Sequence, residues 1–392
     1  MTPRTWKVGI VGFGGAGRSQ LEHFRARRDC RVTAIFDPRE PGLQRARQAA
    51  GECLVTDSWD RFLGSGLEIV AVCSPDRTHA DYTVASLEAG KHVICEKPMT
   101  DSAEGYRRML AAEERATGVV AAVQHQMRFI PLFQRMKEIA AAGDLGAVSY
   151  VEGYYVHNLT HRAGQYDTWR FEDGATPLVY SGCHFVDLLR WMLADEVVEV
   201  MGMANHRAFL EYPESDLNVV LLRFRSGVIG KVITAFGAAR PQDHSVRVYG
   251  SRGCLDNNLL FAADGSFRVV SRPFMDWRAG STNPARVRLG MLAANAKAVV
   301  FGRLAEFLLR RYRRTDGDYG VSSYPLRLYE HGHGVASSLD DFMGAVNTGG
   351  RPLCTLAESA RTVAVCLAGV QACRTGRPAA VSEFWSPELG NL

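Results

Sequence analysis

Glycines and one aspartate near the N-terminus have the types and the spacing that bind a dinucleotide. An apolar run at 8–11 breaks into Gly12-Phe13-Gly14-Gly15-Ala16-Gly17, a helical pattern follows, and a second apolar run ends at Asp37. This is the strand, glycine turn, helix, strand and acid of a dinucleotide-binding βαβ unit. Gly12 permits the tight turn, Gly14 lets the backbone approach a pyrophosphate, and Gly17 lets the helix lie close to the strand. The phosphates would then meet free N–H groups at the positive end of the helix.

The acid indicates which dinucleotide is expected. Asp37 lies twenty residues beyond Gly17, where a carboxylate accepts hydrogen bonds from a ribose diol and favours NAD over NADP. Arg39 follows two residues later and could tolerate a 2′-phosphate, so NADP stays open. The sequence therefore predicts bound NAD, held by the turn and by the end of the second strand: Gly12, Phe13, Gly14, Gly15, Ala16, Gly17 and Asp37.

A lysine follows a later apolar run. Glu96-Lys97-Pro98 comes directly after a predicted strand at 91–95, so Lys97 projects into the crevice beyond the carboxyl ends of parallel strands. A lysine there can donate to a substrate hydroxyl and lower its pKa, which helps alkoxide formation before a hydride leaves for NAD. A solvated lysine at the start of a loop is the alternative. Because X–Pro bonds are the common cis sites, Pro98 is a candidate for a cis bond that fixes the direction of Lys97.

The same edge of the sheet is predicted to carry further cofactor-binding residues. A buried strand at 68–73 ends there, beside the strand at 91–95. We expect the cofactor groove to be lined by the residues that follow these two strands: Ser74, Pro75, Asp76, His79, Glu96 and Lys97. Loop residues without a role are the competing interpretation.

A second cluster lies on a predicted helix. If this helix begins by Tyr180, then Tyr180, His184 and Asp187 share one face at positions i, i+4 and i+7. His184 could act as a general acid or base at neutral pH, since the reference pKa of histidine is about 6.5. A histidine beside an apolar stripe is often structural, and Asp187 could instead form only a salt bridge with Arg190, so these alternatives stay open.

Length and composition bound the class of protein. At 392 residues the chain is too long for one ordinary hydrophobic core, so two domains are expected. Its net charge of +4 demands no nucleic-acid partner, and its nine cysteines lack the spacing of a metal finger. No apolar run reaches the length of a membrane span, and the N-terminus leads almost directly into the first strand without room for a signal peptide. We expect a cytoplasmic protein.

Two patterns divide the chain into domains. Over 1–124, unbroken apolar runs alternate with helical patterns, which predicts a doubly wound α/β fold with a parallel sheet covered on both faces. Over 125–392, many strands alternate apolar and polar residues, and Ser226-Gly227 is typical of a hairpin turn. This second part is predicted to be an α+β domain with a large, mostly antiparallel open sheet. Helices are expected there at 183–194, 287–313, 335–347 and 356–374.

The order of these motifs resembles one enzyme family. The resemblance is carried by the glycine turn, by Ser74-Pro75 with His79, and by the AGKHVICEKP run from Ala89 to Pro98. The RF…P…F…G…LG pattern from Arg128 to Gly146, the GxHxxDLLRW helix from Gly182 to Trp191 and the TGRP turn from Thr375 to Pro378 extend it over most of the chain. The chain is similar to the glucose–fructose oxidoreductase/inositol dehydrogenase (Gfo/Idh/MocA) oxidoreductases.

The resemblance implies a Rossmann domain followed by an α+β domain whose open sheet often serves as an oligomer interface. It also implies a sugar, cyclitol or related polyol substrate, a homodimer or homotetramer, and Lys97 and His184 as the catalytic lysine and histidine. Tyr180 is a third predicted catalytic residue. The predicted substrate-binding residues gather around these positions and the start of the second domain: Lys97, Arg128, Tyr155, His157, Trp169, Arg170, Tyr180 and His184. A metal site at His157, His161 and His184 is conceivable, but their spacing does not indicate one, so no metal is predicted.

One position departs from the family pattern. The family usually has an aspartate four residues before the catalytic histidine, and this chain has Tyr180. A neutral tyrosine donates a hydrogen bond where a carboxylate accepts one. Tyr180 would then replace the acid as a donor beside Lys97, or fit a substrate with a carboxylate or keto group, or weaken dehydrogenation in favour of another reaction. That other reaction would be a redox-neutral lyase or glycosidase with tightly held, recycled NAD. The third hypothesis is a protein that binds the cofactor and senses a ligand or partner without catalysis.

Overall fold

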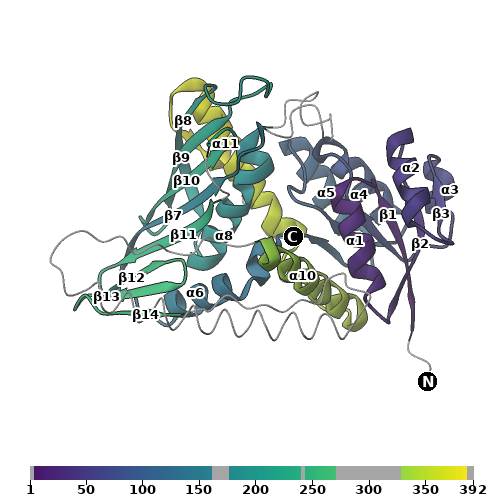
Figure 1. The fold of residues 1–392 in the computed structure, drawn as a ribbon, viewed down its shortest axis with the longest axis horizontal. Helices are drawn as coiled ribbons and strands as arrows, with labels where there is room; N and C mark the ends of the chain where they lie inside the picture. Colours follow the sequence, from purple (N-terminus) through teal and green to yellow (C-terminus); the bar gives the residue numbers. More distant parts are fainter. Residues whose placement is uncertain (1–3, 161–175, 240–242, 271–327, 386–392) are drawn as a thin grey trace.

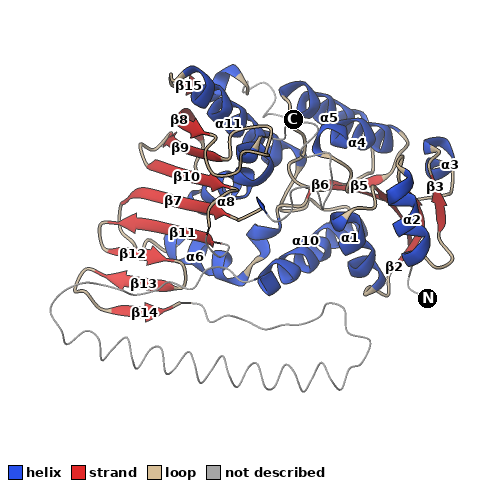
Figure 2. Cartoon of the chain, turned by 45° about the horizontal axis from the view of Figure 1, so that its top comes forward, coloured by secondary structure: helices blue, strands red, loops and turns tan. Residues whose placement is uncertain are grey.

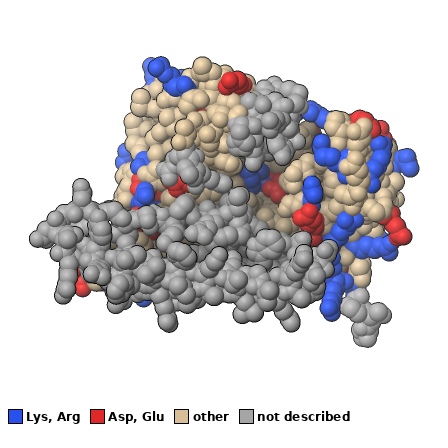
Figure 3. All heavy atoms as spheres, viewed as in Figure 1, with Lys and Arg blue, Asp and Glu red and all other residues tan. Residues whose placement is uncertain are grey.

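Two β-sheets lie side by side and organise the chain (Figure 1). The computed structural model describes residues 4–160, 176–239, 243–270 and 328–385. Within these residues no helix is long and apolar enough to cross a membrane. On the face drawn in Figure 3, acidic and basic side chains are interspersed over the first sheet and its helices, in keeping with the small net charge of +4.

The first sheet has six parallel strands in the order β3-β2-β1-β4-β5-β6. Apolar residues fill consecutive positions of these strands because both faces of the sheet are covered. The strand order reverses between β1 and β4, and ligands of such folds bind beyond the carboxyl ends of the strands at this point. The strands are β1 (Trp6–Val11), β2 (Cys30–Phe36), β3 (Leu54–Thr56), β4 (Ile69–Val72), β5 (His92–Cys95) and β6 (Ala121–Val123).

Helices cover both faces of the first sheet. Those of the N-terminal part are α1 (Gly15–Arg25), α2 (Glu40–Ala49), α3 (Trp59–Leu63), α4 (His79–Glu88) and α5 (Ala103–Arg115). A helix from the far end of the chain, α10 (Leu328–Thr348), lies beside α1 in both views (Figures 1 and 2). Its Phe342 and Met343 belong to the same buried core as Val8 of β1. The C-terminal part of the chain therefore completes the packing of the N-terminal sheet.

The second sheet has nine strands in the order β14-β13-β12-β11-β7-β10-β9-β8-β15. Only the β7–β10 pair is parallel among its described neighbours. The predicted mostly antiparallel open sheet is thereby confirmed. The strands are β7 (Val148–Val156), β8 (Val197–Asn205), β9 (Leu217–Phe224), β10 (Ile229–Ala235), β11 (Asp243–Gly250), β12 (Gly253–Asp256), β13 (Leu259–Ala262), β14 (Phe267–Val269) and β15 (Ala379–Ala380).

Helices cover one face of the second sheet (Figure 2). They are α6 (Pro131–Ala141), the π-helix η4 (Leu178–Gly182), α8 (Cys183–Leu193) and α11 (Leu356–Thr375). Helix α11 belongs to two cores, because Ala360 and Val363 pack with the first sheet and Cys366 and Ala368 pack with the second. A helix that is buried along most of its length thus joins the two sheets.

Several local predictions are confirmed. Gly227 has φ +93° in the β9–β10 turn, as a hairpin glycine requires, and the Lys97–Pro98 bond is cis. The short strands β12, β13 and β15 were not predicted, since runs of two to four residues carry little periodicity. The predicted helix at 287–313 lies outside the described residues. The division into domains at 124/125 stays a prediction.

Candidate functional site

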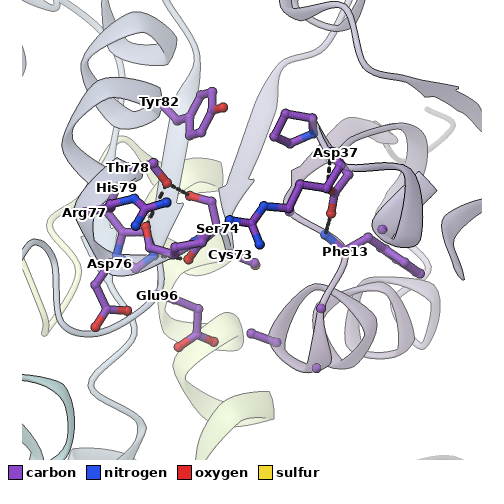
Figure 4. Close-up of a pocket in the computed structure, with 18 of the residues that line it drawn as sticks. Phe13, Asp37, Cys73, Ser74, Asp76, Arg77, Thr78, His79, Tyr82 and Glu96 are labelled. Carbon is purple, nitrogen blue, oxygen red and sulfur yellow. Dashed lines mark hydrogen bonds between the residues drawn. The ribbon is translucent and has the colours of Figure 1, made fainter. Parts of the chain in front are cut away.

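A cavity of about 540 Å³ runs along the carboxyl ends of the first sheet's strands (Figure 4). The glycine turn and Asp37 line one end, the residues that follow β4 and β5 form a second wall, and Tyr180 joins them from the second half of the chain. The predicted cofactor residues found in its lining are Gly12, Phe13, Gly14, Gly15, Ala16, Asp37, Ser74, Pro75, His79, Glu96 and Lys97. The structure thus brings the predicted groove residues together.

The glycine turn is shaped for close backbone approach. A Cβ atom on Gly12, which has φ +83°, would lie 2.8 Å from the carbonyl oxygen of Cys73. A Cβ atom on Gly17 would lie 2.0 Å from the carbonyl oxygen of Gly12, so only glycine lets α1 pack this closely on the turn. Helix α1 begins after Gly14 without a side-chain cap or an acidic residue in its first turn. Its first N–H groups therefore suit the pyrophosphate of a dinucleotide.

Asp37 is fixed at the end of β2. Its Oδ2 accepts a hydrogen bond from the N–H of Phe13 at 2.8 Å, and its Oδ1 accepts one from the N–H of Arg39 at 2.9 Å. Each carboxylate oxygen keeps a further acceptor site, which suits a ribose diol. A Cβ atom on Gly42 would lie 2.0 Å from Oδ2, so this glycine makes room for the acid. The donor and acceptor set fits NAD.

The wall after β4 is held by hydrogen bonds. Thr78 Oγ1 donates to Ser74 Oγ at 2.8 Å. His79 opens α4, and its two ring nitrogens each lie 2.7 Å from a carbonyl oxygen, Nδ1 from that of Pro98 and Nε2 from that of Ser74 (Figure 4 shows the contact with Ser74). With 1% of its surface exposed, His79 joins the loop after β4 to the loop after β5.

Lys97 reaches from the first sheet to the second half of the chain. Its Nζ donates to the carbonyl oxygen of Tyr180 at 3.1 Å and lies 4.4 Å from the centroid of the Tyr180 ring. A carbonyl acceptor and an aromatic face both favour the charged ammonium. In the described part of the chain no carboxylate lies within ion-pair distance of this ammonium. Tyr180 thus contacts the ammonium of Lys97 with both its backbone carbonyl and its aromatic ring.

The helix that carries Tyr180 and His184 begins with a π-turn. The predicted helix starts earlier than Tyr180, because η4 covers Leu178–Gly182 and leads directly into α8. π-Helical turns are rare and are often found at functional sites. A Cβ atom on Gly182 would lie 2.8 Å from Thr234 Oγ1, so this glycine lets the turn approach β10.

His184 belongs to an aromatic cluster on the covered face of the second sheet. Its ring is parallel to that of Tyr155, with 6.0 Å between centroids, and it is 4% exposed. The ring of Tyr155 also lies near those of His157 and His244, with 6.2 Å and 4.3 Å between ring centroids. His244 was not among the predicted site residues. Only the pairing of β7 with β11, which sets His244 opposite Tyr155, brings the two together.

Arg128 lies in a buried ion pair. Its Nε and Nη2 donate to the two carboxylate oxygens of Asp187 at 2.8 Å and 2.6 Å, and each residue is 1% exposed. Burial acts against the charge of Asp187, but the charge and hydrogen bonds of Arg128, together with His125 and Arg190, outweigh it and lower the pKa of this carboxyl to about 2. Asp187 therefore pairs with Arg128 rather than with Arg190, whose Nε donates to Glu196 at 2.8 Å. The substrate-binding role of Arg128 stays a prediction that this geometry does not support.

Some predicted site residues cannot be compared with the structure. Trp169, Arg170 and His161 lie outside the described residues. In the part of the chain that the structure describes, no group of three His, Cys, Asp or Glu side chains could hold a metal ion. Asp76, which was predicted with Ser74 and Pro75 to line the groove, lies in the lining of the cavity. Other lining residues were not predicted, because their scattered types form no motif: Pro38, Pro41, Gly42, Arg45, Cys73, Arg77, Thr78 and Tyr82.

Comparisons with known proteins agree with this architecture. Residues 6–125 match the family model for the GFO/IDH/MocA oxidoreductase family with an NAD-binding Rossmann fold, and residues 133–256 match the GFO/IDH/MocA C-terminal domain. An inositol 2-dehydrogenase of Rubrobacter xylanophilus is 28% identical over 271 residues, which are 68% of this chain and 74% of that protein. A myo-inositol 2-dehydrogenase of Thermotoga maritima is 28% identical over 261 residues, or 63% and 73% of the two chains.

Solved structures share the fold. A scyllo-inositol dehydrogenase from Lactobacillus casei, with bound NAD(H) and scyllo-inositol, has a TM-score of 0.73 at 15% identity, over 97% of this chain and all (100%) of that one. An oxidoreductase from Agrobacterium radiobacter, in complex with NAD+, L-tartaric acid and magnesium, has a TM-score of 0.75 at 15% identity, over 97% and 99% of the two chains. At these identities the likeness concerns the fold alone.

Proposed function

The chain belongs to the GFO/IDH/MocA oxidoreductase family, and we propose that it oxidises a hydroxyl group of a sugar, a sugar derivative or a cyclitol such as inositol. The observation that carries this proposal is the position of Lys97, which lines the cofactor cavity and whose ammonium donates to the carbonyl oxygen of Tyr180. The inositol dehydrogenases among the relatives support the substrate class.

NAD would be held by the cavity of the first sheet and supplies the hydride acceptor when bound. The N-terminus of α1 would hold the pyrophosphate, and Asp37 the adenosine ribose. Ser74, Pro75 and Glu96 line the remainder of the groove. The lining arginines Arg39 and Arg45 leave NADP as a second cofactor to be tested.

Lys97 and His184 would handle the proton of the reacting hydroxyl. An ammonium that donates to the hydroxyl oxygen stabilises the alkoxide form, and a neutral imidazole can accept the proton. The Tyr180 carbonyl and ring would orient the ammonium, while the stacked ring of Tyr155 would orient His184. Tyr155, His157 and His184 would form part of the surface against which a polyol lies.

Replacement of Lys97 tests the proposal. Lys97→Met keeps the length of the side chain and removes the charge, so we expect kcat/KM for the oxidised polyol to fall by about 10²–10⁴. The affinity for NADH, measured by fluorescence titration, should change little. Lys91→Met, in the turn before β5, is the matched control and should leave both quantities unchanged. A Lys97→Met enzyme with normal turnover would refute the mechanism.

Tyr180 is tested by a graded pair of variants. Tyr180→Phe keeps both the ring and the carbonyl that contact Lys97, so kcat should change by less than about threefold if the hydroxyl has no part in catalysis. Tyr180→Leu removes the cation–π contact and should lower kcat more. A large loss in Tyr180→Phe would instead make the hydroxyl a proton donor in the reaction.

A redox-neutral lyase or glycosidase is the second candidate, because Lys97 contacts Tyr180 where the family usually has an aspartate. A single-turnover absorbance trace of reduced nicotinamide, with stoichiometric enzyme and NAD and a panel of sugars, sugar acids, cyclitols and glycosides, separates the two. A rise that persists and grows with added NAD supports the dehydrogenase. A rise that decays while the substrate is chemically altered supports the second candidate.

Self-association belongs to the proposal as well. On the face of the second sheet opposite the described helices, Met201, Met203 and Leu221 expose 47%, 80% and 44% of their surfaces, and Met201 is paired with Leu221 across β8 and β9. A second copy of the chain would bury these side chains in a homodimer or homotetramer. Light scattering on Met203→Glu should show dissociation, because the change introduces a buried charge at the interface. An unchanged mass would place the interface elsewhere.

The proposal also includes the domain boundaries and the cellular compartment. Residues 1–124 would form the cofactor domain and 125–392 the substrate and oligomerisation domain, in a cytoplasmic enzyme. Limited proteolysis of the enzyme with and without NADH tests the division, because bound cofactor should protect the first part most.

A further inference from the structure

Both ring nitrogens of His79 lie within hydrogen-bond distance of carbonyl oxygens, and a neutral histidine could donate to only one of them. Nδ1 lies 2.7 Å from the carbonyl oxygen of Pro98, and Nε2 lies 2.7 Å from that of Ser74. Carbonyl oxygens only accept hydrogen bonds, and a neutral imidazole has one N–H and one lone pair. A neutral ring would therefore press a lone pair against one of the two oxygens. Turning the ring over would replace both nitrogens by carbons and lose both contacts.

The surroundings also favour the protonated ring. Burial acts against the charge of His79, but Cys95, Asp76 and the carbonyl of Pro98 outweigh it and raise the pKa of His79 to about 10. Glu96 is the second acid nearby, and the charges of Lys97 and His79 oppose the rise that burial causes in its pKa. The imidazolium is thus bounded by acceptors and acids.

The two carbonyls that His79 contacts belong to different loops. Ser74 follows β4, and Pro98 directly follows Lys97. His79 itself begins α4 and is 1% exposed. One buried cation therefore fixes the loop that lines the cofactor groove to the segment that carries the lysine.

We propose that His79 is a permanently charged positioning residue, which holds the carbonyls of Ser74 and Pro98 and so fixes the backbone from which Lys97 projects. This inference rests on the proposed function, because it assigns to His79 a role in aligning the lysine of that reaction. It adds that the charge of His79 does not change over the working pH of the enzyme, so His79 takes no part in proton transfer.

The charge is tested by NMR of the full-length protein labelled with ¹⁵N-histidine. Both ring nitrogens of His79 should carry protons at pH 8.5, where an unperturbed histidine, with a pKa of about 6.5, is neutral. The His79→Gln variant assigns the signal by its loss. A His79 signal with one unprotonated nitrogen at pH 8.5 would overturn the proposal. This readout does not depend on any substrate, so it is separate from the outcome for Lys97→Met.

The positioning role is tested by a pair of amide variants. The amide nitrogen of His79→Asn takes the place of Nδ1 and can still donate to Pro98, whereas that of His79→Gln takes the place of Nε2 and can still donate to Ser74. We expect His79→Gln to lower kcat about tenfold, with the KM for NAD nearly unchanged, and His79→Asn to keep more of the kcat. Thr83→Val, on the same helix and buried, is the control for disturbance of α4.

Three results would count against the positioning role. Equal losses of kcat in the two amide variants would show that the contact with Pro98 has no special part. An equal loss in Thr83→Val would show that any disturbance of α4 has the same effect. A rise of the KM for NAD without a change in kcat would make His79 a residue of the cofactor groove only.

Discussion

Two buried histidines of this protein carry different charges. His79 and His125 are each 1% exposed, and each follows a strand of the first sheet. The nitrogens of His79 lie against two carbonyl oxygens. Those of His125 lie 2.8 Å from the hydroxyl of Ser359 and 3.7 Å from the carboxylate of Asp187. Ser359 can donate as well as accept, so His125 needs only one proton.

The charged neighbours explain the rest of the difference. Burial is the largest influence on His125 and, together with the nearby cations Arg128 and Arg190, outweighs the attraction of Asp187, so the pKa of His125 falls to about 4. Asp187 is occupied by its two hydrogen bonds from Arg128. Burial alone therefore does not decide whether a histidine is charged; the acceptors and cations that surround the ring decide it.

The largest expected effect is on the buried ion pair of Arg128 and Asp187 beside His125. Asp187→Asn would leave the guanidinium of Arg128 buried beside a neutral amide, which should lower the free energy of unfolding by about 3–5 kcal/mol. Urea denaturation followed by circular dichroism measures the loss. Asp81→Asn is the matched control, because its ion pair with Arg108 is exposed and should contribute less than about 1 kcal/mol. A loss below about 1 kcal/mol in Asp187→Asn would show that water reaches the pair.

The folded arrangement of charges was only partly predictable from the sequence. The glycine turn and Asp37 were predictable, because a strand, a turn and a helix that follow one another fix their own geometry. The partners of the buried charges were not, since Arg128 and Asp187 are 59 residues apart and His79 is 19 residues from Pro98. Residue types showed that these side chains could pair but not with which group.

The same limit applies to the packing of whole elements. The helical pattern of 335–347 was predicted, and α10 is present, but an apolar stripe does not reveal which sheet it covers. The pattern placed this helix with the second part of the chain, whereas its Phe342 packs in the core of the first sheet. The cluster of Tyr155, His184 and His244 likewise depends on the pairing of β7 with β11.

The second prediction uses pH to separate the two histidines. For His125, the unfolded state, with a pKa of about 6.5, binds a proton before the folded state does, so the free energy of unfolding should fall as the pH drops from about 6.5 to about 4. For His79 the folded state keeps its proton longer, so the free energy of unfolding should fall as the pH rises from about 6.5 towards 10.

On each side, the free energy of unfolding should change by about 1 kcal/mol per pH unit, and replacing the histidine responsible should remove the change on that side only. His125→Gln should flatten the acid side and His79→Gln the alkaline side, in urea denaturation series between pH 4.5 and 9.5. Asp187 adds a further loss of the free energy of unfolding below about pH 4. Its ionised carboxylate stabilises the fold fully above the pKa of the unfolded state, and this stabilisation is lost as the pH falls towards about 2. If both variants flattened the same side, the two histidines would carry the same charge.

The smallest expected effect concerns the hydroxyl partner of His125. Ser359→Ala removes the contact of Ser359 Oγ with Nε2, and the buried nitrogen left without a partner should cost about 1 kcal/mol of the free energy of unfolding. Ser86→Ala, whose hydroxyl donates to the carbonyl of Tyr82 within its own helix, is the control for loss of a buried hydroxyl. The acid-side slope should survive in Ser359→Ala, because burial, together with the cations Arg128 and Arg190, holds His125 neutral and the hydroxyl does not. A slope that disappeared with Ser359 would mean that the hydrogen bond, and not burial and the neighbouring cations, sets the charge of this histidine.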